Sequence, residues 1–121
     1  MKNYNDLKIY QLAYTLALDV HKMSMTLPKY ELWEQGGQVR RSSKSIKDDI
    51  VEGFGRRKYK NDFIRFLIFA QASCDESTSQ LTMINEIHFT DKPISSLIDE
   101  YNKLGRMINK FIQYVELHWK T

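Results

Sequence analysis

The residues best suited to chemistry in this sequence are basic, and they are concentrated in one stretch. Residues 40–65 contain nine Lys or Arg and four Asp or Glu, a local balance of +5, whereas the rest of the chain sums to −2. The candidate site consists of Arg40, Arg41, Lys44, Lys47, Arg56, Arg57, Lys58 and Lys60. Because clustered cations release counterions when they bind phosphates, this stretch predicts a surface that binds RNA or DNA without reading its sequence.

The same stretch leaves a second interpretation open. Asp48, Asp49 and Glu52 lie among the cations, so the charges could also form a solvated face that is partly paired. Tyr59 and Phe54 supply aromatic rings that could stack on bases. The alternative hypothesis is a protein–protein assembly or scaffold module that does not bind nucleic acid.

Catalytic and metal chemistry find little support in the sequence. The three histidines fall in separate segments and share no metal-ligand spacing: His21, His88 and His118. Glu52 is expected to pair with Arg56, four residues later, rather than to act as an acid or base. No serine lies in a nucleophile elbow, and Cys74 is expected to be a buried, inert thiol. We therefore expect no enzymatic activity, no metal and no cofactor.

Four segments of the chain must position the basic residues of the candidate site. Each segment repeats apolar or small residues three and four positions apart, and this spacing predicts a helix. The first begins near Asp6, its expected N-cap, and Pro28 ends it or starts the next. The second covers about residues 29–53. The inward-facing row of residues on each helix is called its seam here, and the seam of the second helix contains small residues that allow another backbone to approach closely. Gly53 is expected to adopt the left-handed conformation that ends a helix.

The third segment has Asn61 as its expected N-cap and continues to His88, and the fourth runs from Pro93 to His118. Four such segments joined by short breaks predict one all-α domain over residues 1–121, an antiparallel up-and-down four-helix bundle. The positions expected to face its core include Ile46, Ile50, Leu67 and Ile108.

Apolar surface outside these seams indicates self-association. The third segment carries Phe66, Ile68 and Phe69 beside its seam, and the first carries Tyr10 and Tyr14. Left in water, these side chains would form a larger apolar patch than monomers usually expose. We therefore expect contacts with further copies of the chain.

Composition limits the class of protein to which the chain can belong. The chain has 121 residues, a formal charge of +3 and a single cysteine, which excludes an intrachain disulfide framework and fits a reducing compartment. Its purely apolar runs are only a few residues long, too short to span a membrane. Its N-terminal residues lack the pattern of a signal peptide. These features predict a cytoplasmic protein without membrane contact.

A set of residues across the first three segments follows a known family pattern. It comprises Pro28, Glu31, Gln38–Ser42, Ser45–Arg56, Phe63, Phe66, Leu67, Ala70 and Ala72–Glu76. This pattern resembles that of the four-helix bundle proteins encoded in 23S rRNA intervening sequences. The chain departs from it in having Asp49 for the usual Asn and Val51 for Ala. Further departures lie at Gln35, Ser42, Lys47 and Ala72.

The resemblance implies a homopentamer with no established enzymatic activity. The family is related to the accessory variability determinant of diversity-generating retroelements, a basic pentamer that binds nucleic acid. The expected function is therefore that of a non-catalytic oligomeric bundle. Its basic stripe on the second helix, with the loop that follows, is expected to bind nucleic acid non-specifically, and its expected partners are copies of itself, RNA or DNA, or another protein.

Overall fold

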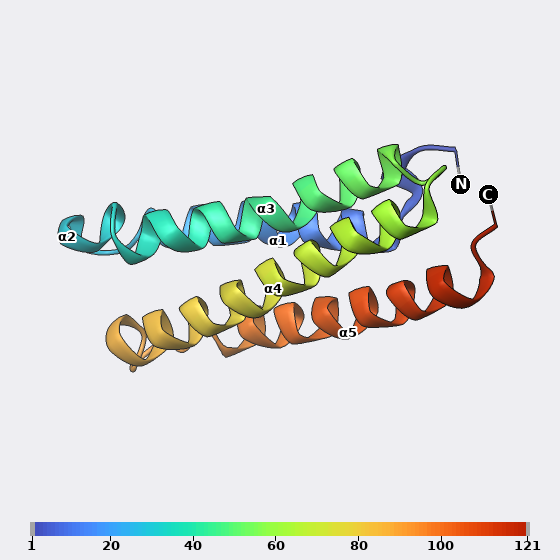
Figure 1. The fold of residues 1–121 in the computed structure, drawn as a ribbon. Coiled ribbons are helices and arrows are strands. Elements are labelled where there is room, and N and C mark those ends of the chain that lie inside the picture. The colour runs from blue at the N-terminus through green and yellow to red at the C-terminus, as the bar shows by residue number, and fades with distance from the viewer. Residues whose placement is uncertain (1, 121) are drawn as a thin grey trace.

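The structure is a computed structural model that describes residues 2–120. Its elements in chain order are η1 (Tyr4–Asp6), α1 (Lys8–Ser24), α2 (Lys29–Leu32), α3 (Gln35–Gly55), α4 (Lys60–His88) and α5 (Ser95–His118). The four long helices α1, α3, α4 and α5 lie lengthwise, and each runs antiparallel to the long helix before it (Figure 1). α3 packs against α1 and α4, and α5 packs against α4 and α1. The predicted all-α fold with four long helices is confirmed.

The core runs along the whole bundle and contains the residues that the seams predicted. Ile46, Ile50, Leu67 and Ile108 each have 0% of their surface exposed. Their burial follows from the spacing of three and four, which places apolar side chains on one face of each helix. No helix within residues 2–120 is both long enough and apolar enough to cross a membrane.

The predicted second helix is divided into two. The short helix α2 ends at Leu32, and α3 begins at Gln35 after a turn. Gly36 lies under this turn, because a Cβ atom there would be 3.1 Å from the carbonyl oxygen of Glu31 and 3.1 Å from the guanidinium of Arg40. The missing side chain thus lets α2 fold closely onto the first turn of α3.

The prediction for Gly53 is wrong. No glycine in the described residues has a positive φ, and α3 continues through Gly53 to Gly55. Gly53 instead lies where α3 and α4 approach each other, since a Cβ atom there would be 3.0 Å from Cβ of Phe66 and 3.3 Å from the carbonyl oxygen of Phe63. Its small size, rather than its backbone freedom, is what the fold requires.

The first helix starts one residue later than predicted. Asp6 is not the N-cap of α1; its carboxylate accepts hydrogen bonds from the backbone N–H groups of Lys2 (3.0 Å) and Asn3 (3.1 Å). The Asn3 side chain accepts one from the N–H of Asn5 at 2.9 Å. These bonds form a capping box around η1, and the buried Leu7 then leads into α1.

The starts of the last two helices also differ from the predictions. α4 begins at Lys60, so Asn61 lies inside the helix and Tyr59 is the N-cap, without a side-chain capping bond. α5 begins at Ser95 rather than at Pro93. The backbone N–H of Ile94 donates to the Asn85 side chain at 2.8 Å, and this tertiary bond fixes the entry into α5 in place of a local cap.

Candidate nucleic-acid interface

The turn between α3 and α4 lies at the end of the bundle where both ends of the chain also lie (Figure 1). Two hydrogen bonds attach this turn to the C-terminal part of α5. Nζ of Lys60 donates to the carbonyl oxygen of Glu116 at 2.7 Å, and Nε1 of Trp119 donates to the carbonyl oxygen of Arg57 at 3.1 Å. The turn is therefore a fixed part of the bundle end.

Positive charge gathers at this end. Residues 2–8, 52–65 and 110–120, which meet there, contain nine Lys or Arg and four Asp or Glu. At the opposite end, residues 21–41 and 85–97 contain five Lys or Arg and four Asp or Glu. We call the first of these the basic end. The bundle is thus electrically polarised along its length, and lysines from both ends of the chain add to the cations of the turn.

Arg40, the first predicted site residue, has a structural role: its side chain forms hydrogen bonds within the bundle. Its Nη1 donates to Oγ of Ser24 at 2.9 Å and its Nη2 donates to the carbonyl oxygen of Leu32 at 2.7 Å. The guanidinium therefore joins the end of α1 to α2, and these bonds leave it little freedom to contact a ligand.

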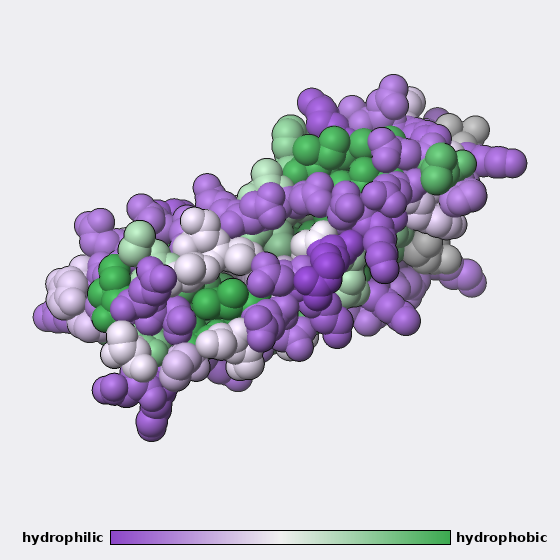
Figure 2. Space-filling model, turned by 90° about the horizontal axis from the view of Figure 1, so that it is seen from below, coloured by the Kyte–Doolittle hydropathy of each residue, from purple (hydrophilic) through white to green (hydrophobic). Residues whose placement is uncertain are grey.

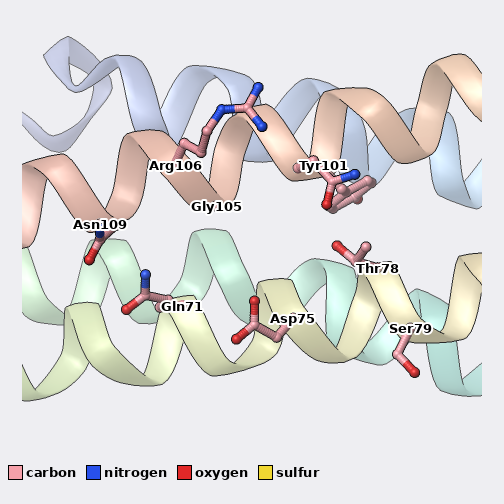
Figure 3. A pocket seen from close by; sticks show the side chains of 9 residues that line it. Gln71, Asp75, Thr78, Ser79, Tyr101, Gly105, Arg106 and Asn109 are labelled. Atoms are coloured by element: carbon pink, nitrogen blue, oxygen red, sulfur yellow. The ribbon is translucent and has the colours of Figure 1, made fainter.

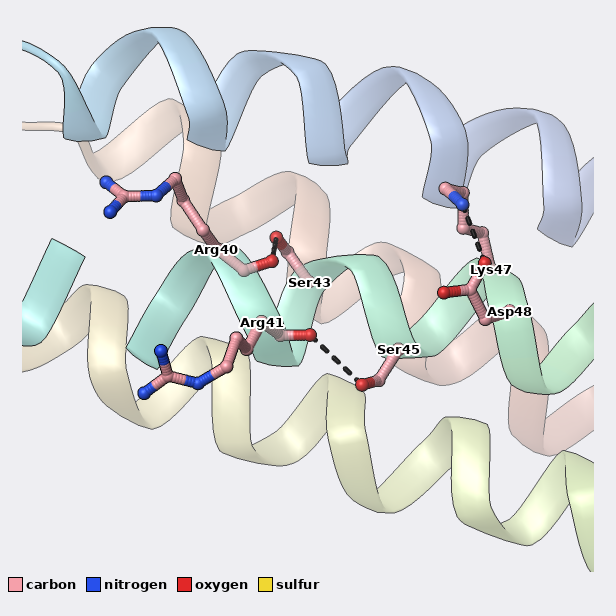
Figure 4. Close-up of polar contacts among 6 residues, drawn as sticks. All are labelled: Arg40, Arg41, Ser43, Ser45, Lys47 and Asp48. Carbon is pink, nitrogen blue, oxygen red and sulfur yellow. Dashed lines mark hydrogen bonds and ion pairs between the residues drawn. The ribbon is translucent and has the colours of Figure 1, made fainter. Parts of the chain in front are cut away.

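Two of the other predicted cations of α3 are more accessible than Arg40. Arg41 and Lys44 are exposed and form no ion pair with the described residues. Arg41 lies beside α4 and Arg40 beside α1 (Figure 4). Nζ of Lys47 lies 2.7 Å from a carboxylate oxygen of Asp48, so its charge is partly compensated. Arg41 and Lys44 are therefore the two cations of α3 that remain available to a ligand, and we call these two residues the α3 stripe.

Within the turn, Arg56 is paired. Its Nε lies 3.2 Å from Oε2 of Glu52, which confirms the predicted pair, and its Nη1 lies 3.6 Å from Oδ2 of Asp62. Its guanidinium also lies 4.8 Å from the ring centroid of Phe66. Both acidic partners are partly exposed, so solvent screens these pairs.

The two aromatic residues that were expected to supply stacking groups differ in accessibility. Phe54 is buried, and the guanidinium of Arg57 covers its ring at 4.0 Å while donating to its carbonyl oxygen at 2.9 Å. Tyr59 is 63% exposed, and Nζ of Lys58 lies 5.8 Å from its ring centroid. Only Tyr59 of the two can therefore reach a base, and Lys58 is exposed beside it.

Asp49 lies on α3 at the position where the family pattern has Asn. The side chain is half-buried, and the pKa of its carboxyl group is raised, first by burial and then by the charges of Asp48 and Glu52. The protein environment thus disfavours a negative charge at this position, as expected for a site that usually holds a neutral amide.

A buried polar pair, Glu31 and His88, was missed by sequence reasoning. Nε2 of His88, the last residue of α4, lies 2.8 Å from Oε2 of Glu31, and Gln35 donates to the same oxygen. The hydrogen bond from His88 is the main cause that lowers the pKa of Glu31. The two residues are 57 positions apart, so no local spacing could reveal the contact. The pair fastens α2 to the end of α4, far from the basic end.

The acid dependence of stability tests this pair. Because the pKa of Glu31 is lower in the folded chain than the usual 4.5, its stabilising contribution is complete above 4.5 and is lost as the pH falls through the folded value. Replacing Glu31 with Gln removes that titration. We expect the difference in free energy of unfolding between the two proteins to shrink on acidification, measured by urea titration at about pH 7, 5 and 3. A difference independent of pH would contradict this role.

The remaining residues that could carry chemistry lie away from the cations of the candidate site. Cys74 is buried, as predicted, and burial raises the pKa of its thiol to about 12. Within residues 2–120, no group of three or more His, Cys, Asp or Glu is arranged to hold a metal ion. An open polar groove of about 600 Å³ lies between α4 and α5, where Gln71 and Asp75 point from α4 toward α5 (Figure 3). None of the eight predicted site residues lines it.

The family model described as 23S rRNA-intervening sequence protein matches residues 5–110, which is most of the chain. The chain belongs to this family. The match includes α1, α2, α3 and α4 and the first two thirds of α5, so the basic turn lies within the family region. Among curated proteins, none gives a significant match to the chain.

Proposed function

We propose that this member of the 23S rRNA-intervening sequence protein family is a non-catalytic module that binds nucleic acid through its basic end and the exposed cations Arg41 and Lys44 of α3. The observation that carries the proposal is the polarised charge, with nine cations against four acids at one end and five against four at the other. A polyanion approaching the bundle would therefore be steered to one end of it.

The groups available at this surface favour phosphate binding over base reading. Arg41, Lys44 and Lys58 extend flexible cationic side chains into solvent. Such side chains neutralise phosphates irrespective of sequence, and the released counterions supply much of the binding free energy. Binding without sequence preference and with a steep dependence on salt is the expected behaviour.

Self-association would strengthen this binding. Among the residues expected to contact other copies, Tyr14 is 45% exposed, Ile68 50% and Phe69 45%. Tyr10 and Phe66 are instead partly buried within their own chain. The face drawn in Figure 2 shows separate apolar patches among hydrophilic side chains. We propose that the exposed Tyr14, Ile68 and Phe69 lie in the contacts between copies of a ring of five, which at +3 per chain would carry +15.

Light scattering at micromolar concentration tests the ring. We expect a mass near five times 14.4 kDa. Replacing Phe69 with Glu places a charge in the proposed interface and should shift the mass downward, because burying an unpaired carboxylate between subunits is strongly unfavourable. A monodisperse species of 14.4 kDa for the unmodified protein would contradict the proposed assembly.

Titration of the unmodified protein with labelled single-stranded RNA and duplex DNA tests the binding function. Affinity for both is expected at low salt and should fall steeply as salt is raised from about 50 to 200 mM. Failure to bind either nucleic acid at low salt would rule out the proposed function.

A protein assembly module is the second candidate. At the end opposite the basic end, Tyr30 is 71% exposed and Trp33 is 77% exposed. Large aromatic side chains of this kind are enriched where proteins contact one another. Absence of nucleic-acid binding in the titration, together with a stable oligomer, would favour this second function.

A further inference from the structure

Tyr59 presents its ring from a rigid support. Its backbone N–H donates to the carbonyl oxygen of Arg56 at 2.8 Å, and its carbonyl oxygen accepts from the N–H of Phe63 at 3.0 Å. The main chain is thus fixed on both sides, while 63% of the residue remains open to solvent. A backbone that is fixed before binding lowers the entropic cost of ordering this ring against a ligand.

The surroundings of the ring suit a nucleotide. Nζ of Lys58 lies 5.8 Å from the ring centroid, close enough for this flexible side chain to contact the phosphate of a base stacked on Tyr59. Arg57 lies over Phe54 and Arg56 is paired with Glu52 and Asp62, so neither guanidinium blocks the Tyr59 ring.

We propose that the basic end prefers single-stranded nucleic acid, with one base stacked on Tyr59 and an adjacent phosphate held by Lys58. The proposal rests on the proposed function and specifies the form of nucleic acid that this site takes. In a duplex, each base is already stacked between its neighbours, so the ring can add nothing to duplex binding without disrupting the helix. In a single strand the bases are free to stack on an aromatic side chain.

The test compares single-stranded DNA of about 20 nucleotides with the duplex that it forms with its complement. Fluorescence anisotropy gives the affinity of the unmodified protein and of Tyr59→Ala for each. We expect Tyr59→Ala to weaken single-strand binding about tenfold, whereas duplex binding should stay within about twofold. The slope of log affinity against log salt should not change, because the substitution removes no charge.

Two further variants separate stacking from other effects. Tyr59→Phe keeps the ring and should bind the single strand like the unmodified protein. Tyr30→Ala removes a similarly exposed tyrosine from the opposite end and should bind both nucleic acids normally. Unchanged single-strand affinity in Tyr59→Ala, or an equal weakening for the duplex, would overturn this inference and leave the proposed function standing. Failure of the unmodified protein to bind either form would overturn both.

Discussion

Replacing Leu67 with Ala is expected to lower the free energy of unfolding by about 2 to 5 kcal/mol. Leu67 has 0% of its surface exposed, and it lies on α4, which packs against both α3 and α5. Removing its branched side chain would leave a cavity between helices that cannot move together without displacing other core residues. Ile46, Ile50 and Ile108 are equally buried, and their replacement by Ala should have an effect of the same size.

Leu117 provides a matched control, because it is a leucine of α5 that is 76% exposed. Leu117→Ala should change the free energy of unfolding by no more than about 0.5 kcal/mol. Chemical denaturation of each variant, with the slope compared to that of the unmodified protein, measures these values. Decreases below about 0.5 kcal/mol at all four core positions would mean that the helical faces are wrongly assigned.

Replacing Gly53 with Ala is expected to destabilise the protein by about 1 to 3 kcal/mol, although alanine is the better helix former. The added Cβ would lie 3.0 Å from Cβ of Phe66 and 3.3 Å from the carbonyl oxygen of Phe63. One of these neighbours is backbone and the other is the first atom of a side chain, so neither clash can be relieved by rotating a flexible group. The helices α3 and α4 would have to move apart.

Gly55, two residues later in the same helix, gives the opposite prediction. A Cβ atom there would have no neighbour within 4 Å, and its backbone has no positive φ. Gly55→Ala should therefore stabilise the protein by up to about 1 kcal/mol through helix propensity alone. Thermal unfolding of the two variants side by side separates packing from propensity. Equal stabilisation by both would show that the close approach at Gly53 is not required.

The sequence predicted the number of long helices and their inward faces because burial follows helical periodicity. Ile50 and Leu67 could be assigned to the core from spacing alone, since every long helix hides one face in a bundle. Helix ends were predicted less well. Asn61 and Asp6 have side chains suited to capping, yet a competing turn of η1 and the extended backbone of Tyr59 decide where these helices begin.

The candidate site was only partly visible in the sequence. The cluster of cations was apparent, but sequence alone could not show that Arg40 would bond Ser24 and Leu32. Nor could it place the lysines of residues 2–8 and 110–120 beside the turn, because that proximity depends on the antiparallel order of the helices. Local spacing describes one helix at a time, whereas charge polarity is a property of the assembled bundle.

The most direct test of the basic end is the salt dependence of duplex DNA binding in two variants from which the same charge is removed. One replaces Arg41, Lys44 and Lys58 with Gln; the control replaces Lys22, Lys29 and Lys92, three exposed lysines at or near the opposite end, with Gln. We expect the first variant to flatten the slope of log affinity against log salt by about 0.9 for each phosphate that the protein no longer neutralises. The control should keep the slope of the unmodified protein. Equal slopes in all three proteins would contradict the assignment of nucleic-acid binding to the basic end and the α3 stripe.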